Sequence, residues 1–236
     1  MRIDVDRGGT RLETELDALY PHCLKNAAVD GTIFLPSLNE TPLSRYRRTA
    51  DGETFLYIED PEQRWLAGNV TLNRVIGLDR KLDRFIRSPH SRFREPYQRQ
   101  GLATRLYLEA LNAGLCLLSG ARQSPGALQL WRSLSEHYPL HHVQMQGKQL
   151  VDLGRSIEWK TFEDLHTRLL LCGAGWSAKQ LLALARPSER KLSARLRLKQ
   201  QTLNMQARRD TTGISPGHRR THAMPEQLTT NHRQHG

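Results

Sequence analysis

The chain has 236 residues, of which 38% are hydrophobic, and a formal net charge of +11; this length and apolar content are enough for one core of ordinary size. It contains no run of 18 or more apolar residues and its first residues lack the pattern of a signal peptide, so neither a membrane span nor export is predicted, and we expect a cytoplasmic protein. The three cysteines are widely spaced and show no metal-ligand spacing, which argues against a disulfide framework and a structural zinc site and predicts reduced, mostly buried thiols.

The first half of the chain is predicted to contain a helix followed by extended segments. Residues 10–24 place leucines at near-helical spacing, with a proline that disturbs the end. Residues 54–60 and 65–77 are rich in β-branched or aromatic side chains and are joined by the turn-like sequence DPEQ, so they are predicted to form an antiparallel pair. A weaker extended segment, FIRSPHSRF at residues 85–93, follows them.

From Gly101 the hydrophobic pattern changes to a helical period. Apolar residues recur about every four positions over residues 102–113, which predicts a helix. The run LCLLS at residues 115–119 is almost wholly apolar, as expected of a strand buried on both faces. Ser124, followed by a proline, then matches the start of a second helix. Residues 141–154 are typical of two strands joined by a tight turn.

This order of elements predicts an α/β fold with a mixed, mostly antiparallel sheet flanked by helices. We place the folded domain at residues 1–153. Residues 154–186 look helical, apart from two glycines, and are predicted to be a helical extension. Residues 187–236 begin as a basic helix but then contain too few apolar residues to offset the entropy of ordering, so a basic, largely disordered tail is predicted.

The sequence YQRQGLATR at residues 97–105 places a glycine at the start of a predicted helix. A glycine there lets an anion approach the backbone closely, and the first-turn N–H groups and the helix dipole favour a phosphate or pyrophosphate. Arg99 and Arg105 add positive charge nearby. The alternative interpretation is an ordinary helix cap, and the sequence is neither a P-loop nor a complete dinucleotide fingerprint.

Two motifs resemble those of a known family. Gln98-Arg99-Gln100-Gly101-Leu102-Ala103 resembles the Q/R-x-x-G-x-G/A motif of the GNAT superfamily of N-acetyltransferases. Downstream, SPGALQLW at residues 124–131 is similar to the N-x-x-A-x-x-x-Y helix of that family, at the expected separation. The resemblance covers about residues 50–153. The sequence around both motifs is also similar to acetyltransferase-like proteins of bacteriophages or prophages.

The resemblance implies acetyl-coenzyme A (acetyl-CoA) as co-substrate, with no metal and no covalent enzyme intermediate. The pantetheine arm would run beside the strand that ends at Phe93, and Ser124 stands where the family has its asparagine. An amine would attack the thioester directly, so Cys116 is expected to be a core residue and not a nucleophile. The pyrophosphate would lie on the backbone N–H groups of the glycine loop, which comprises Gln98, Arg99, Gln100, Gly101, Leu102, Ala103 and Thr104.

The general acid departs from the family pattern. Trp131 stands where the family's tyrosine protonates the departing thiolate, and an indole N–H is far too weak an acid for that role. Tyr138, at the end of the same helix, is the first candidate for the general acid, and Tyr97 is another. For both tyrosines, ordinary packing is the alternative interpretation.

The general base is equally open in the sequence. His90 lies on the strand that leads into the glycine motif, where family members sometimes place a base, and its intrinsic pKa range suits proton transfer. Glu95 and Asp60 are further candidates, and a relayed water could replace all three.

Most of the net positive charge lies at the end of the chain. From Arg186 onward there are eleven Lys or Arg residues and three acidic residues, a surplus of eight positive charges. As a helix, ERKLSARLRLKQQ at residues 189–201 would show an apolar stripe flanked by charge, which can lie on nucleic acid, an acidic protein or a membrane surface. The alternative is a solubilising extension with no fixed partner.

Two functions from different classes follow. The first is an acetyl-CoA-dependent N-acetyltransferase with an unknown amine acceptor, favoured by the intact glycine loop. The second is a catalytically inactive GNAT-fold binding protein whose basic tail contacts nucleic acid or an acidic partner, favoured by Trp131.

Overall fold

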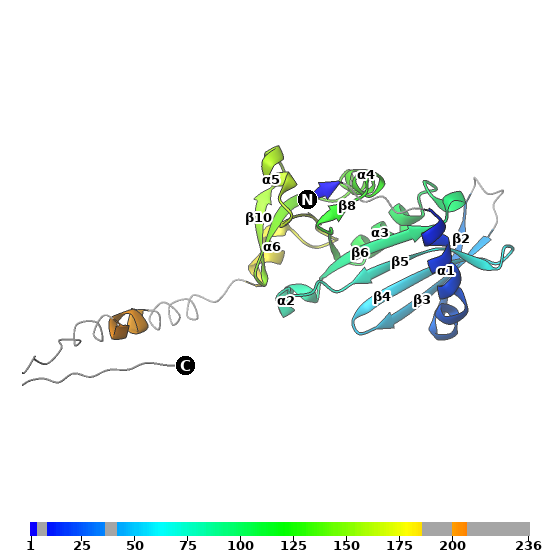
Figure 1. Cartoon of the computed structure of the whole chain (residues 1–236), viewed down its shortest axis with the longest axis horizontal. Coiled ribbons are helices and arrows are strands. Elements are labelled where there is room, and N and C mark those ends of the chain that lie inside the picture. The colour runs from blue at the N-terminus through cyan, green and yellow to red at the C-terminus, as the bar shows by residue number, and fades with distance from the viewer. Residues whose placement is uncertain (4–8, 36–41, 186–199, 207–236) are drawn as a thin grey trace, which may run out of the picture. The chain divides into compact units, whose positions relative to one another are not determined.

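The computed structural model describes residues 1–3, 9–35, 42–185 and 200–206. The chain divides into two compact units, residues 1–186 and 187–236, and the first unit holds the sheet (Figure 1). Of the second unit, residues 200–206 are described and form a short helix with exposed side chains. The predicted disorder of the tail falls otherwise on residues outside the described ones. Within the described ranges, no helix is long and apolar enough to cross a membrane.

The elements follow one another in a mixed order of helices and strands. The helices are α1 (Gly9–Cys23), α2 (Arg80–Asp83), α3 (Leu102–Asn112), α4 (Pro125–Leu134), α5 (Trp159–Glu163) and α6 (Ala178–Ala183), with 3-10 turns at Leu24–Asn26 and Glu95–Tyr97. The strands are β1 (Arg2–Ile3), β2 (Ala28–Phe34), β3 (Pro42–Ala50), β4 (Glu53–Asp60), β5 (Trp65–Asn73), β6 (Ile86–Phe93), β7 (Cys116–Leu118), β8 (Arg122–Gln123), β9 (Leu140–Gln146), β10 (Gln149–Gly154) and β11 (Thr167–Leu171).

Nine of the described strands form one sheet in the order β10-β9-β11-β7-β6-β5-β4-β3-β2. Neighbouring strands are antiparallel except β6 and β7, which run parallel. β1 and β8 form a separate parallel pair. The predicted class, a mixed and mostly antiparallel sheet flanked by helices, is therefore confirmed.

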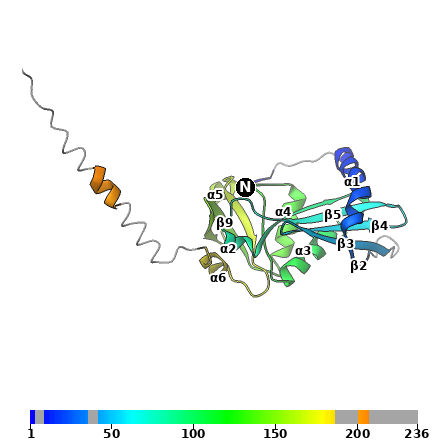
Figure 2. The same ribbon diagram turned by 90° about the horizontal axis from the view of Figure 1, so that it is seen from below.

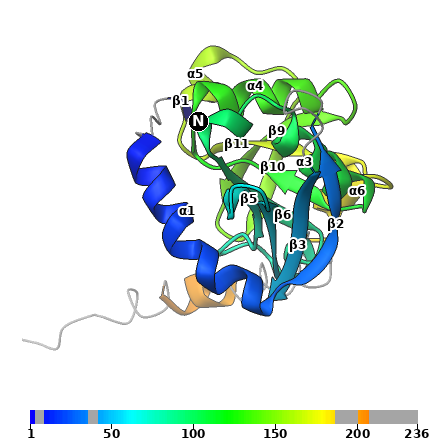
Figure 3. The ribbon, with the colours of Figure 1, turned by 90° about the vertical axis from the view of Figure 1, so that its right-hand side faces the viewer.

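Helices cover both faces of the sheet. Leu102 and Leu106 of α3 share a buried cluster with Trp131 of α4 and with one set of strand side chains. On the other face, Leu16 of α1 packs against β4 and β5, while Leu181 of α6 packs against β7 and β11. Accordingly, α1 and α3 lie on opposite sides of the strands (Figure 2 and Figure 3).

The predicted helical extension over residues 154–186 is wrong in its centre. Residues 167–171 form β11, which lies between β7 and β9 and pairs with both. Its leucines, Leu169, Leu170 and Leu171, are buried alternately in the clusters on the two faces of the sheet. A fully buried strand has no alternation of polar and apolar residues, so its sequence also fits a buried helix. Residues 167–171 thus belong to the central sheet, with the short helices α5 and α6 on either side of them in the sequence.

The last two strands at one end of the sheet are not predicted from the sequence. β2 and β3 extend the sheet beyond β4, and most of their side chains are exposed or only partly buried. Their sequences, AVDGTIF and PLSRYRRTA, are interrupted by glycine or rich in arginine, so they lack a clear strand pattern. They matter for the site because Arg45 of β3 pairs with Glu109 of α3, and Asp30 of β2 pairs in turn with Arg45.

Candidate functional site

The strands β6 and β7 pair over two residues and then separate. Ile86 is opposite Cys116 and Arg87 is opposite Leu117, whereas β6 continues to pair with β5 as far as Phe93. Beyond Arg87, no strand of the described chain pairs with β6 on the β7 side. We call this divergence, between residues 88–93 of β6 and the end of β7, the fork.

Two backbone N–H groups of β6 point into the fork. The N–H of Arg94 donates to the Ala67 carbonyl at 2.9 Å, so it faces β5. Backbone groups alternate sides along a strand, and the pairing of β6 with β5 is continuous. The N–H groups of Phe93 and Ser91 therefore face the fork, while Pro89 has no N–H to offer.

The glycine loop lies directly after the end of β6. Gly101 is the N-cap of α3 and has φ 76°, and Arg99 also has a positive φ of 57°. A Cβ on Gly101 would meet no atom within 4 Å, so the backbone angle and not crowding calls for glycine here. The side-chain amide of Gln98 donates to the Phe93 carbonyl at 2.8 Å, which fastens the loop to β6.

Two helices begin at the open end of the fork. Because β6 and β7 are parallel and lead into α3 and α4 respectively, both helix N-termini lie at the same edge of the sheet. The first N–H groups of α3 have no partners within their helix, and with the helix dipole they favour an anion. The predicted cofactor residues of the glycine loop are thus brought together with Phe93.

Ser124 lies at the start of α4. Its hydroxyl accepts a hydrogen bond from the Ala127 N–H at 3.1 Å, so it caps the helix. This contact agrees with the capping role considered for this residue, and a role in cofactor binding stays a prediction.

The two predicted catalytic residues are not brought together. His90 is on β6, on the face that also carries Arg92, and the Arg92 guanidinium contacts Glu15 of α1 at 2.6 Å. His90 therefore lies on the α1 face of the sheet. The Tyr138 hydroxyl donates to the Asn112 side chain at the C-terminal end of α3, about 16 Å along the helix from the glycine loop.

Tyr97 and Asp60 are committed to a buried network. The Tyr97 hydroxyl donates to the Asp60 carboxylate at 2.5 Å and accepts from the Trp65 indole N–H at 3.0 Å. Asp60 also accepts two backbone N–H groups of the following turn. Burial, together with the bond to Asp60, raises the pKa of Tyr97 to about 12. Both side chains thus hold the β4–β5 turn against the entry to the glycine loop.

The structure reveals a phenol that the sequence analysis missed. Tyr107 is on α3, 3% exposed, in the core cluster that faces β6. Burial raises the pKa of Tyr107 to about 12, and a polar contact with Ser91, on the part of β6 that borders the fork, acts in the opposite direction. In the sequence, Tyr107 is one of several residues in a helical pattern and belongs to neither motif. Nothing in the sequence alone therefore indicates a role for its hydroxyl.

Trp131 lies in the core. It is 3% exposed and packs in the same buried cluster as Leu102 and Leu106 of α3. Its indole therefore joins α4 to α3 and the sheet.

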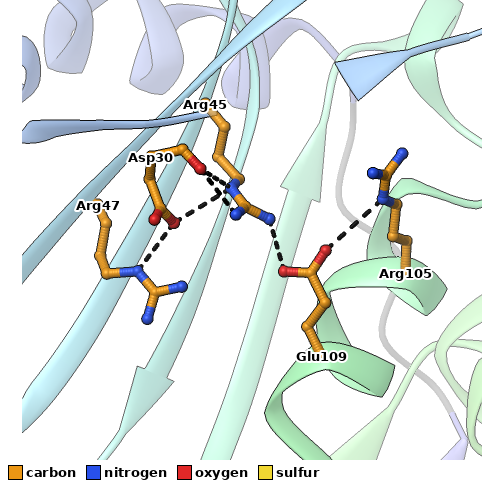
Figure 4. A network of polar contacts seen from close by, with 5 residues as sticks. All are labelled: Asp30, Arg45, Arg47, Arg105 and Glu109. Atoms are coloured by element: carbon orange, nitrogen blue, oxygen red, sulfur yellow. Dashed lines mark hydrogen bonds and ion pairs between the residues drawn. The ribbon is translucent and has the colours of Figure 1, made fainter. Parts of the chain in front are cut away.

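An ion-pair network fixes the exposed side of α3 to β2 and β3 (Figure 4). Glu109 lies between Arg45 of β3, at 2.5 Å, and Arg105 of α3 itself, at 3.6 Å. Asp30 of β2 pairs with Arg45 at 3.1 Å and with Arg47 at 2.8 Å. Arg45 is largely buried, whereas Arg105 is half exposed and lies in α3 four residues after Gly101.

Comparisons with known proteins were made by sequence and by structure. No protein-family model matches the sequence, and no curated protein is significantly similar. A solved structure of a GNAT superfamily phosphinothricin acetyltransferase from Sinorhizobium meliloti, in complex with AcCoA, is 15% identical, with a TM-score of 0.35, and the match covers 58% of this chain and 67% of that one. At this identity and TM-score the similarity assigns neither a family nor an activity, and nothing in the comparisons supports the bacteriophage resemblance.

Proposed function

We propose that the protein is an acetyl-CoA-dependent N-acetyltransferase. The observation that carries the proposal is the fork between β6 and β7, with the glycine-capped N-terminus of α3 at its open end. This arrangement offers backbone donors to an extended amide-containing arm and, one loop further on, an anion site for a pyrophosphate. Acetyl-CoA combines both groups in one molecule.

The chain's own groups divide the binding between them. The N–H groups of the glycine loop from Gln98 to Thr104 would hold the pyrophosphate, with Arg99 and Arg105 adding positive charge. The Ser91 and Phe93 N–H groups would donate to the pantetheine amides or to the thioester carbonyl. A donor placed at that carbonyl stabilises the oxyanion that forms when an amine attacks.

Proton transfer needs a base for the amine and an acid for the thiolate. His90 lies on the α1 face of β6 and would accept the proton that the attacking amine loses, directly or through water. Tyr107 lies on the α3 face beside Ser91 and would give a proton to the departing thiolate. The net result is an acetamide and a free coenzyme A thiol, after which His90 releases its extra proton to solvent and Tyr107 regains one.

Calorimetric titration with acetyl-CoA tests the binding site. Thr104 is the third residue of α3, where a carboxylate stabilises a helix N-terminus but repels a bound pyrophosphate. Thr104→Glu should keep or raise the melting temperature and weaken acetyl-CoA binding about tenfold or more, which corresponds to roughly 1.4 kcal/mol.

The matched control is Thr104→Gln, which has nearly the same shape and no charge. It should bind acetyl-CoA within about threefold of wild type, a difference of less than 1 kcal/mol. Equal affinities of the Glu and Gln variants, or no binding by a folded wild type, would contradict the proposed site.

A binding protein without catalysis is the second candidate. It is favoured by one observation, the burial of Trp131 where the resemblance expects a catalytic tyrosine. Such a protein would bind acetyl-CoA without releasing thiol in the presence of any amine of a panel that includes amino acids, polyamines and lysine peptides. In that case the surplus of positive charge after Arg186 would direct the search to nucleic acid or an acidic partner.

A further inference from the structure

Cys116 and Cys172 lie directly opposite each other at the end of the β7–β11 pairing. β11 pairs with β7 in the register Leu170 to Leu118 and Leu171 to Leu117, so the next pair along the two chains is Cys172 with Cys116. Both side chains belong to the same buried cluster on the α6 face, and both residues are 0% exposed.

The backbone around the pair brings the two cysteines close together. The Cys116 N–H donates to the Phe85 carbonyl and the Cys172 N–H donates to the Pro139 carbonyl, so each N–H points away from the other cysteine. In an antiparallel sheet this is the non-hydrogen-bonded kind of pair, in which facing Cα atoms are only about 4.5 Å apart. That separation lies within the range that a disulfide spans.

The two sulfurs have unequal surroundings. The Gly173 N–H donates to the Cys116 sulfur at 3.4 Å, and a hydrogen bond from Cys172 lowers the pKa of the Cys116 thiol in spite of its burial. The same contact and burial raise the pKa of Cys172. Because a backbone N–H points at its sulfur, Cys116 is the cysteine whose thiolate the fold stabilises, and Cys172 is placed to react with it second.

We propose that Cys116 and Cys172 form a reversible cross-strand disulfide when the folded protein meets a peroxide. The Cys116 thiolate attacks one oxygen of hydrogen peroxide, the O–O bond breaks, and hydroxide leaves, giving a sulfenic acid. The Cys172 sulfur then attacks the Cys116 sulfur, and water leaves as the S–S bond forms. Overall two thiols lose two electrons and two protons, and one peroxide is reduced to two waters.

The position of the pair gives the disulfide a defined structural effect. Cys116 is also the residue opposite Ile86, at the base of the fork, so the new bond would fasten β11 to β7 next to the place where β6 and β7 part. The proposal does not depend on acyl transfer, because it rests on the register, burial and hydrogen bonds of the two strands.

Cys23 serves as the internal control. It is buried in the separate cluster under α1, its thiol donates to the Tyr20 carbonyl at 3.5 Å, and burial raises its pKa to about 11. It is thus a third buried cysteine without a cysteine opposite it among the described residues.

The test is peroxide treatment of the full-length folded protein, followed by alkylation under denaturing conditions and peptide mapping. We expect a mass loss of two hydrogen atoms, a peptide pair joined through Cys116 and Cys172, and alkylated Cys23. The melting temperature should rise by several degrees and return on addition of a thiol reductant. The Cys23→Ser variant should behave in the same way. In the Cys172→Ala variant, Cys116 should be oxidised to the sulfenic acid or further to the sulfinic acid, with no joined peptide.

Three results would overturn the proposal. They are three free thiols after treatment of the folded protein, a disulfide that includes Cys23, and oxidation of Cys116 to sulfinic acid in wild type without any joined peptide. The Cys23→Ser variant retains both cysteines of the pair, so a folding failure of Cys172→Ala leaves the test intact.

Discussion

At the scale of single residues, the structure changes which tyrosine is the best candidate for the general acid. The sequence pointed to Tyr138, yet that hydroxyl is at the far end of α3, bonded to Asn112. Tyr107, in the middle of α3, contacts Ser91 on the strand that borders the fork. Tyr138 lies only seven residues after Trp131 in the sequence, but its hydroxyl contacts the C-terminal end of α3, about 16 Å along that helix from the glycine loop.

Tyr107→Phe tests the phenol as proton donor. With an acceptor amine chosen from the panel above, kcat should fall about 100-fold, the usual scale for removal of a general acid, while acetyl-CoA affinity stays within about threefold of wild type. The measurement is thiol release under saturating acetyl-CoA, beside calorimetric binding. An unchanged kcat would remove Tyr107 from the reaction, and Tyr138→Phe is the control that should leave kcat unchanged.

The same residue predicts a pH dependence of stability. Its pKa is raised by burial to about 12 in the folded chain, against about 10 when unfolded. The folded state keeps the proton to higher pH, so this stabilisation is complete below pH 10 and is lost as the pH rises toward 12. The unfolding free energy of wild type should fall more steeply from pH 10 upward than that of Tyr107→Phe, by at most about 1.4 kcal/mol per pH unit. Denaturant unfolding at several pH values measures both slopes, and equal slopes would contradict the buried phenol.

At the scale of elements, the close contact between β5 and β6 shapes one side of the fork. Gly68 is opposite Phe93, and a Cβ on Gly68 would lie 2.3 Å from the Phe93 ring and 2.4 Å from the Arg92 carbonyl. The absence of a side chain at Gly68 is therefore what lets the end of β6 lie flat against β5, with the Phe93 and Ser91 N–H groups turned toward the fork.

Gly68→Ala should destabilise the fold by about 1–3 kcal/mol, because the added methyl group forces backbone and ring to move. It should also weaken acetyl-CoA binding, since Phe93 shifts. The control is Gly126→Ala in α4, where a Cβ would meet nothing within 4 Å and helix propensity favours alanine by up to about 1 kcal/mol. Thermal and denaturant unfolding compare the two; a Gly68→Ala protein as stable as wild type would show that β5 and β6 are not in such close contact.

At the scale of the whole molecule, the elements that could be predicted from the sequence are those whose patterns are local. The glycine loop, α3 and the buried strand β7 were predicted because a left-handed cap, a helical period and an apolar run each leave a mark over a few residues. The sequence of β11 predicts a helix, because the burial of this strand comes from β7 and β9, which are distant in sequence. The fork itself could not be predicted, because it depends on where the pairing of two strands stops.

The central claim is that the fork binds acetyl-CoA. Its most direct test is the rate of hydrogen exchange at individual backbone amides, measured by NMR with and without acetyl-CoA. If the fork receives the pantetheine arm, exchange at Ser91 and Phe93 should slow by about tenfold or more, since each N–H gains a partner. Arg92 between them faces β5 and should change far less. Saturating acetyl-CoA that leaves Ser91 and Phe93 exchanging as before would contradict the claim that the fork is the binding site.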